Sequence, residues 1–339
     1  MPDRRDDMIV ALVGPTAVGK SDLAIALAQR VDAEIVSADS MQVYVGMDIG
    51  TAKVPPAERG GVAHHMIDVW SPDHDVSVVE FRDRARARVR EIEQRGGSVI
   101  VVGGSWLYVQ AILDEMDFPG TDPQIRARLE ADLLEVGAAQ MHARLAELDA
   151  AAADAILPTN GRRIVRALEV VELRGSFTAR LPEPRPWRAT HWIGMSCDRL
   201  VLDARITERV DRMWAAGLVD EVRRLAPRLG RTARGALGYR QVVEALETAG
   251  EVPVSGATVH RDDEKTATAP TQTSGDVEAL LERARWATVE GTRKFARRQE
   301  RRFRQDQRVQ WVPAGSGVDE VLRRFGSPDT WSTRANGVR

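Results

Sequence analysis

The sequence predicts an α/β fold, in which a parallel β-sheet carries helices on its faces and an all-helical domain is inserted after the first strands. Three observations support this prediction. Apolar runs typical of buried strands occupy residues 8–13 and 98–102. A glycine-containing loop connects the first run to an amphipathic segment at 22–28. Residues 117–187 have only helical periodicity, and a proline-rich stretch at 182–186 closes them.

The loop after the first apolar run has the composition of a phosphate-binding loop. Its glycines let the backbone approach an anion, and the following helix directs N–H groups and its positive dipole end toward that anion. Lys20 can reach terminal phosphates, and the Ser21 hydroxyl is placed to ligate a magnesium ion. A glycine turn that opens an ordinary helix is the alternative. The sequence therefore predicts a P-loop NTPase-like core that binds a di- or triphosphate through Gly14, Pro15, Thr16, Ala17, Val18, Gly19, Lys20 and Ser21.

The composition is that of a globular enzyme. Hydrophobic residues make up 43% and charged residues 29% of the 339 positions, which excludes a disordered chain. The net charge of −2 argues against nucleic-acid binding over the whole surface but permits a local basic face. The single cysteine, Cys197, excludes an internal disulfide, and no apolar run has membrane-spanning length. We therefore expect a cytoplasmic monomer without a membrane partner.

Polar residues follow two of the expected strands. Asp39 and Ser40 come after an apolar segment at 34–38, and Gly103-Gly104-Ser105 comes after 98–102. Because ligands of open parallel sheets bind beyond the carboxyl ends of the strands, these residues share an edge with the phosphate loop. Asp39 could be a magnesium partner, a general base or a helix cap. Many phosphate-loop NTPases have a magnesium-holding aspartate where this chain has Gly-Gly-Ser, which argues against an ATPase.

Helical periodicity and charge define the expected domains. Between residues 291 and 308 the basic side chains exceed the acidic ones by six, which indicates contact with a polyanion. Residues 251–275 are hydrophilic and poor in apolar side chains, so we expect a mobile loop there. The domains are the first part of the core at 8–116, an inserted helical domain at 117–187, the returning core with its basic helix at 188–312, and a peripheral tail at 313–339.

Further motifs accompany the phosphate loop. They are Ser37-Ala38-Asp39-Ser40 with Gln42 and Tyr44, Met47 to Lys53, His64 to Asp68, Val102 to Ser105, Gly161 to Glu169, and Ala236 to Arg240. Together with the loop, this set resembles the bacterial tRNA dimethylallyltransferases, or isopentenyl-tRNA transferases, of the IPP transferase family. The resemblance covers roughly residues 8–250 and resumes near Thr292.

The resemblance implies transfer of a dimethylallyl group from dimethylallyl diphosphate to N6 of the adenosine 3′ of the tRNA anticodon, with release of diphosphate. It implies that Asp39 acts as the general base on the amine. Lys20, Arg209 and Mg²⁺ held by Ser21 would stabilise the leaving diphosphate. Ser105 matches a family threonine that contacts the substrate base and the leaving group, and it retains the hydroxyl.

The resemblance also implies that the inserted domain grips the anticodon stem-loop. The matching tRNA-binding positions are Asp39, Ser40, Met41, Gln42, Arg126, Arg162, Arg163, Arg166, Gly238, Tyr239, Arg240, Arg297 and Arg298. The sequence also departs from the family pattern beside Ser105 and in the basic helix. Trp106 stands where a small residue is common, and Arg301-Arg302 stands where Thr-Trp is common. Phe303 and Trp311 are the candidates to replace that tryptophan.

Two other functions fit part of this pattern. A nucleoside or small-metabolite kinase would use the same loop with Asp39 as its base, but it explains neither the basic helix nor the arginine-rich insertion. A non-catalytic RNA-binding or switch protein leaves Asp39 and Ser105 unexplained. We therefore expect the prenyltransferase.

Overall fold

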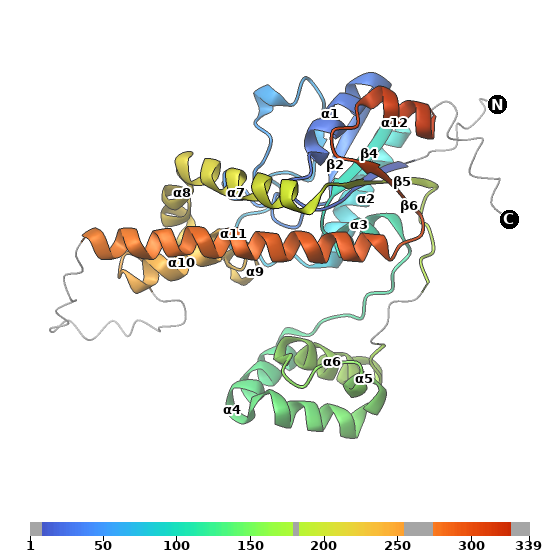
Figure 1. Ribbon diagram of the computed structural model, residues 1–339. Helices are drawn as coiled ribbons and strands as arrows, with labels where there is room; N and C mark the ends of the chain where they lie inside the picture. The colour runs from blue at the N-terminus through green and yellow to red at the C-terminus, as the bar shows by residue number, and fades with distance from the viewer. Residues whose placement is uncertain (1–8, 179–182, 254–273, 327–339) are drawn as a thin grey trace. The chain divides into compact units, whose positions relative to one another are not determined.

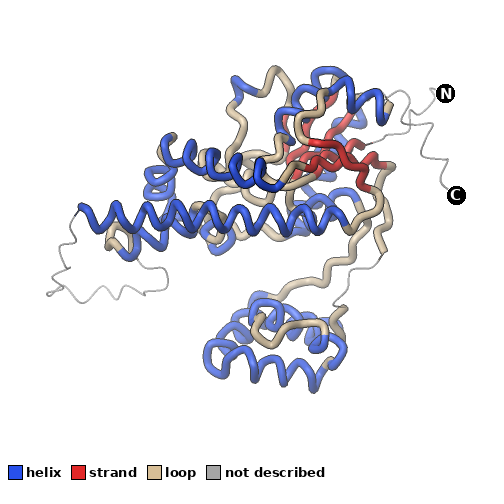
Figure 2. The backbone as a smooth tube through the Cα atoms, viewed as in Figure 1, coloured by secondary structure: helices blue, strands red, loops and turns tan. Residues whose placement is uncertain are grey.

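The chain folds into two compact units. The computed structural model describes residues 9–178, 183–253 and 274–326. The first unit combines the described residues up to Asp114 with those from Pro186 onward, and the second is Glu115–Arg185. Within the described residues, all strands belong to the first unit and the second contains only helices and loops (Figure 2). Most of the loop expected at 251–275 lies outside the described residues.

A six-stranded parallel sheet forms the centre of the first unit (Figure 1). The strands lie side by side in the order β3-β2-β4-β1-β5-β6. Their bounds are β1 (Ile9–Val13), β2 (Ala33–Ser37), β3 (His64–His65), β4 (Ser98–Gly103), β5 (Thr190–Ser196) and β6 (Val309–Pro313). The chain therefore leaves the sheet after β4, forms the helical unit, and returns as β5 beside β1.

Strand β1 shows why the apolar runs are continuous. Ile9, Ala11 and Val13 belong to the hydrophobic cluster on one face of the sheet, and Val10 and Leu12 belong to the cluster on the other. All five are buried, because helices cover both faces of a central parallel strand. Alternation of apolar and polar residues is therefore absent there.

Helices cover both faces of this sheet. The cluster on one face includes residues of α2, α3, α8 and α10, and the cluster on the other includes α1, α7 and α12, while α11 contributes to both. The bounds are α1 (Lys20–Val31), α2 (Val78–Gln94), α3 (Trp106–Leu113), α7 (Arg199–Ala215), α8 (Leu218–Leu225), α9 (Arg231–Arg234), α10 (Tyr239–Thr248), α11 (Ser274–Arg304) and α12 (Val318–Phe325), with short 3₁₀ helices at Pro56–Glu58 and Ala226–Arg228. None of the described helices is both long and apolar enough to cross a membrane.

The second unit consists of α4 (Pro123–Leu148), α5 (Ala150–Asp154) and α6 (Gly161–Arg174). The Asp122 side chain accepts hydrogen bonds from two backbone N–H groups of the first turn of α4, which fixes the helix start before its first residue, proline. Gly137, with φ 81° and ψ 167°, interrupts α4. The helical periodicity expected for this domain is therefore present on both sides of a break at Gly137.

The expectation of a peripheral tail from residue 313 is wrong for its described part. Strand β6 pairs with β5 and runs to Pro313, and α12 follows it. Val321 and Phe325 are buried in the same hydrophobic cluster as α1. The spacing of Val318, Val321, Leu322 and Phe325 gives α12 one apolar face, which the sheet edge can bury.

Candidate active site

The loop between β1 and α1 has a backbone that requires glycine. Gly14 has φ 146°, and a Cβ atom there would lie 2.6 Å from the carbonyl oxygen of Met195 in β5. Gly19, the N-cap of α1, has φ 99° and provides no side-chain acceptor for the first turn. The N–H groups of that turn are therefore available to an anion at the carboxyl edge of the sheet.

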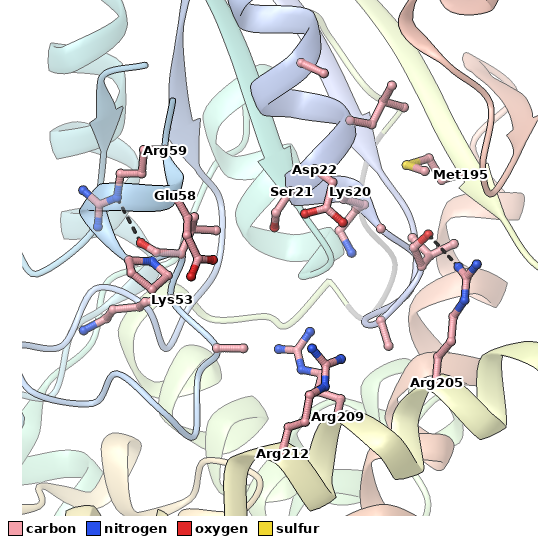
Figure 3. Close-up of a pocket in the computed structure, with 18 of the residues that line it drawn as sticks. Lys20, Ser21, Asp22, Lys53, Glu58, Arg59, Met195, Arg205, Arg209 and Arg212 are labelled. Atoms are coloured by element: carbon pink, nitrogen blue, oxygen red, sulfur yellow. Dashed lines mark hydrogen bonds between the residues drawn. The ribbon is translucent and has the colours of Figure 1, made fainter. Parts of the chain in front are cut away.

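A cavity of about 1170 Å³ opens in front of this loop. Lys20, Ser21 and Asp22 line it from α1 (Figure 3). From α7 it is lined by Arg205, Arg209 and Arg212, whose i, i+4, i+7 spacing places them on one helix face.

The cations of α7 have different partners. Arg205 donates to the carbonyl oxygen of Val18 in the loop, at 3.4 Å. Arg209 and Arg212 extend side by side toward the cavity in Figure 3. Neither forms a hydrogen bond or an ion pair within the described part of the chain. Two guanidinium groups without a protein counterion thus face the phosphate loop. Sequence reasoning singled out Arg209 but missed Arg212, although the seven-residue spacing from Arg205 was visible.

Lys20 completes the basic end of the cavity. Its Nζ donates to the carbonyl oxygen of Pro15, at 2.7 Å. Burial, and then the neighbouring Arg209, lower the pKa of Lys20 to about 7, while the charge of Asp39 opposes that shift. Burial also lowers the pKa of Arg209. Lys20, Arg209 and Arg212 form no ion pair with a described residue although acidic residues also line the cavity, so these three cations can bind an anion there.

Asp39 lies two positions beyond the end of β2. Its Oδ1 accepts hydrogen bonds from the backbone N–H groups of Met41, at 2.8 Å, and Gln42, at 3.4 Å. This is the turn-capping contact that an aspartate makes with residues two and three positions on. Asp39 is not among the residues that line the cavity, but its charge partly opposes the lowering of the pKa of both Lys20 and Arg209. Its Oδ2 forms no hydrogen bond with the described residues.

The end of β4 lies against the end of β2. A Cβ atom at Gly103 would lie 2.7 Å from the carbonyl oxygen of Ala38, so only glycine permits this approach. Ser105 is the N-cap of α3, yet its side chain makes no capping hydrogen bond. Like Asp39, Ser105 does not line the cavity described above.

A buried carboxylate fixes the opposite wall of the cavity. Glu221 of α8 is 3% exposed and accepts hydrogen bonds from the backbone N–H groups of Asp48, Ile49 and Gly50, at 3.0, 2.9 and 3.1 Å. The Tyr239 hydroxyl donates to the same carboxylate. Because the Tyr239 ring occupies the space beside Gly50, a Cβ atom there would lie only 2.4 Å from it. Nothing local in the sequence indicated Glu221, which lies more than 170 positions from the three backbone N–H groups that donate to it.

The candidate tRNA-binding residues in the core differ in accessibility. Tyr239 is fully buried, so its side chain has a packing role, whereas the neighbouring Arg240 is exposed. The Gln42 side chain bonds to Ser37 and to the carbonyl oxygen of Thr51. Ser40 and Met41 are half-buried, and Gly238 is the N-cap of α10.

In the helical unit, Glu169 holds two of the candidate arginines. Its carboxylate is fully buried and pairs with Arg126 and Arg166, and the Thr121 hydroxyl also donates to it. Burial would raise the pKa of Glu169, but the hydrogen bonds from Arg126, Thr121 and Arg166 outweigh it and lower the pKa to about 2. Arg162 and Arg163 are exposed at the start of α6.

Helix α11 carries a strip of cations, which we call the basic strip and define as Lys294, Arg297, Arg298 and Arg301. None of the four forms an ion pair with a described residue. Of the other basic residues in this stretch, those at 293, 304 and 308 are paired with acids, whereas Arg302 forms no ion pair with a described residue. The local excess of positive charge is therefore concentrated on the basic strip and Arg302; of these five side chains Arg297 is half-buried and the others are exposed.

The sequence model of the family described as IPP transferase matches residues 42–306, which is more than half of the chain. The chain belongs to the IPP transferase family. Among curated relatives of this family member, the tRNA dimethylallyltransferase of Thermobifida fusca is 51% identical over 94% of this chain and 93% of its own. That of Streptomyces coelicolor is 50% identical over 94% of each chain.

Solved structures agree with this assignment. The full-length tRNA isopentenylpyrophosphate transferase of Bacillus halodurans is 33% identical, with a TM-score of 0.65 over 98% of this chain and 100% of its own. The tRNA isopentenylpyrophosphate transferase of Staphylococcus epidermidis is 30% identical, with a TM-score of 0.62 over 94% of this chain and 97% of its own. The α/β fold of this IPP transferase family member is therefore shared with solved relatives.

Proposed function

We propose that this chain transfers the dimethylallyl group of dimethylallyl diphosphate to N6 of the adenosine 3′-adjacent to the anticodon of tRNA, and releases diphosphate. The observation that carries the proposal is the convergence of Lys20, Arg209 and Arg212 on one cavity at the phosphate loop. The tRNA dimethylallyltransferase of Thermobifida fusca, 51% identical to this chain, supports the choice of substrates.

The cations act on the leaving group. As the bond between the dimethylallyl C1 and the diphosphate oxygen breaks, negative charge grows on that oxygen. Lys20 binds the phosphates in its protonated form, because a bound dianion raises the pKa that burial and Arg209 have lowered. Arg209 can bridge two phosphate oxygens through its planar guanidinium. Arg212, one turn further along α7, adds a third cation.

Asp39 acts on the nucleophile. Its Oδ1 is held by two backbone N–H groups, so the carboxylate has a fixed direction while Oδ2 remains free to accept a proton. The N6 amine of the adenosine attacks C1 of the dimethylallyl group and then loses a proton to Asp39. The Ser105 hydroxyl, which makes no capping bond, is available to contact the base or the leaving group.

Magnesium fits this site as an ion that accompanies the substrate. The described residues contain no group of three or more His, Cys, Asp or Glu side chains that could hold a metal. Mg²⁺ in phosphate sites commonly takes most of its ligands from phosphates and water. Ser21 lines the cavity, and its hydroxyl forms no hydrogen bond with a described residue, so it can supply one ligand. The ion would supply additional charge stabilisation for the diphosphate.

The tRNA contacts follow from accessible charge. We assign the phosphate contacts to the basic strip of α11, to Arg162 and Arg163 of the helical unit, and to Arg240. Arg126 and Arg166 are engaged by Glu169 and stabilise the helical unit itself. Extrusion of the target adenosine costs a few kcal/mol, and anchoring of the stem-loop by these cations offsets that cost.

The test separates prenyl transfer from phosphoryl transfer. The purified chain is incubated with tRNA and either dimethylallyl diphosphate or ATP, each with Mg²⁺, and the nucleosides are identified by mass spectrometry. A prenylated adenosine that forms only with dimethylallyl diphosphate supports the proposal. An ATP-dependent phosphorylated product without prenyl transfer would establish the kinase instead.

The role of Asp39 is tested by Asp39→Asn, which retains an acceptor for the N–H groups of Met41 and Gln42 but removes the base. We expect kcat to fall about 10²- to 10⁴-fold, with tRNA affinity unchanged within about twofold. Asp22→Asn is the matched control, because Asp22 lines the cavity without contacting a described partner. Equal losses in both variants would exclude Asp39 as the base.

A further inference from the structure

We infer that Gln299, on the basic helix α11, is a positioning residue for the phosphate loop. Its side-chain Oε1 accepts a hydrogen bond from the backbone N–H of Thr16, at 2.8 Å. The two residues are 283 positions apart, and Gln299 is 7% exposed. The inference rests on the proposed function. In that function α11 binds tRNA, and the inference gives the same helix a second role at the diphosphate site.

Gln299 also lies against the loop that follows β4. A Cβ atom at Gly104 would lie 2.4 Å from Nε2 of Gln299 and 3.2 Å from the carbonyl oxygen of Gly14. The amide of Gln299 therefore occupies the space where the loop after β1 meets the loop after β4. Only a residue without a side chain at position 104 leaves room for it.

The inward face of α11 explains how the amide is held in place. Ala296 and Phe303 are buried and lie three positions before and four after Gln299, so the three share one helix face. Arg298 and Arg301 of the basic strip are exposed. Adjacent residues 298 and 299 thus belong to different faces, one directed to solvent and the other to the phosphate loop.

Gln299 preorganises the backbone of the loop for diphosphate binding. Anion binding at a phosphate loop depends on several backbone N–H groups that already point at the ligand. Gln299 fixes the position of Thr16, which precedes the left-handed residue Ala17, at φ 64°. Without an acceptor at position 299, the half-buried N–H of Thr16 loses its partner and the loop gains alternative conformations.

The experiment uses the full-length chain and a pair of neighbouring variants. Gln299→Met removes the acceptor with little change in side-chain length, and Arg298→Ala removes the exposed cation one position earlier. For each we measure the Kd of inorganic diphosphate with Mg²⁺ by calorimetry, the Kd of unmodified tRNA, and KM and kcat for dimethylallyl diphosphate.

We expect Gln299→Met to weaken diphosphate binding about tenfold, the size expected for an N–H left without its partner, while tRNA affinity stays unchanged. Arg298→Ala should give the reverse pattern. Unchanged diphosphate affinity in Gln299→Met would overturn the inference, and so would equal loss of both ligands. Diphosphate binding can be measured without turnover. Absence of prenyl transfer in the parent chain would therefore refute the proposed function, whereas the role of Gln299 would still be decided by the diphosphate affinities.

Amide exchange supplies a readout that a general loss of packing does not reproduce. Gln299→Glu retains an acceptor oxygen, so the Thr16 amide should remain protected in this variant and lose protection in Gln299→Met. Equal protection in both would contradict the inference. If Gln299→Met does not fold, Gln299→Asn serves in its place, because its shorter side chain withdraws the oxygen and keeps the amide.

Discussion

The guanidinium carbon of Arg302 lies 5.8 Å from the centroid of the Trp106 ring. Both residues stand at sites where the sequence departs from the pattern of the family that it resembles, one at the start of α3 and the other near the end of α11. Phe303, a candidate replacement for the missing tryptophan, is fully buried in the core, and the other candidate, Trp311, is contacted by Arg304. The aromatic ring that faces position 302 is therefore supplied by α3.

The first prediction concerns this contact. Arg302→Ala and Trp106→Ala should each reduce the free energy of unfolding, and the double variant should reduce it by less than the sum. The coupling energy should be about 0.5–1 kcal/mol, as for a cation above an aromatic ring at a partly exposed site. Urea denaturation of the four proteins measures it. Strict additivity would mean that the two side chains do not interact.

The second prediction concerns the pKa of Lys20, which is lowered to about 7. Since diphosphate favours the charged ammonium, binding above that pH takes up a proton, and affinity should fall as the pH rises from about 7 to about 9. Lys20→Arg keeps its charge throughout this range and should flatten the profile. Calorimetry with inorganic diphosphate in buffers of different ionisation enthalpy measures both effects. An equally steep profile in Lys20→Arg would assign the titration to another group.

The same shift has a consequence for stability. In the unfolded chain the lysine titrates near its ordinary pKa of 10.5, so between about 7 and 10.5 the unfolded state binds more protons than the folded one. The contribution of Lys20 to the free energy of unfolding therefore rises with pH across this window, and it is absent in Lys20→Met. Denaturation of the two proteins at several pH values tests the sign.

The third prediction concerns the basic strip of α11. Arg298→Ala should weaken tRNA binding and reduce the slope of log Kd against log salt concentration by roughly 0.7 to 0.9, the change expected for one lost phosphate contact. Arg323→Ala is the control, because Arg323 is an exposed arginine of α12 without a described partner. It should change neither the affinity nor the slope. An unaltered slope in Arg298→Ala would place Arg298 in solvent in the complex.

The fourth prediction concerns Glu169 in the helical unit. Glu169→Gln leaves Arg126 and Arg166 without their carboxylate and should cost about 3 kcal/mol of unfolding free energy, because it breaks a buried charge network. Glu172→Gln is the control, because Glu172 pairs with Arg128 and Arg144 at a more exposed position. That variant should lose less than about 1 kcal/mol.

The pH dependence of this network has the opposite sign to that of Lys20. The lowered pKa of Glu169, about 2 against 4.5 in the unfolded chain, gives a stabilising contribution that is complete above about 4.5. It should be lost as the pH falls toward 2, and the Glu169→Gln variant should lack this part of the acid sensitivity. Acid titration of the unfolding free energy compares the two proteins.

Much of the first unit could be predicted from local patterns. Residues 98–102 lie in strand β4, as predicted, and the loop after β1 has a backbone that requires glycine at position 14. Burial on both faces of a strand and tight turns restrict the residue types, so local patterns predict both features. The packing of α12 in the core was missed. Its single apolar face indicates that the helix is buried, but it does not indicate which element it packs against.

Local patterns predicted the apolar runs at 8–13 and 98–102, the glycine loop and the density of positive charge on α11, since each depends on neighbours along the chain. Which side chains meet depends instead on the three-dimensional packing. Three contacts join segments that are far apart in the chain: that of Gln299 with Thr16, that of Glu221 with residues 48–50, and that of Arg302 with Trp106. Such contacts leave no periodic pattern in the sequence, because the packing of helices on the sheet brings the two residues together.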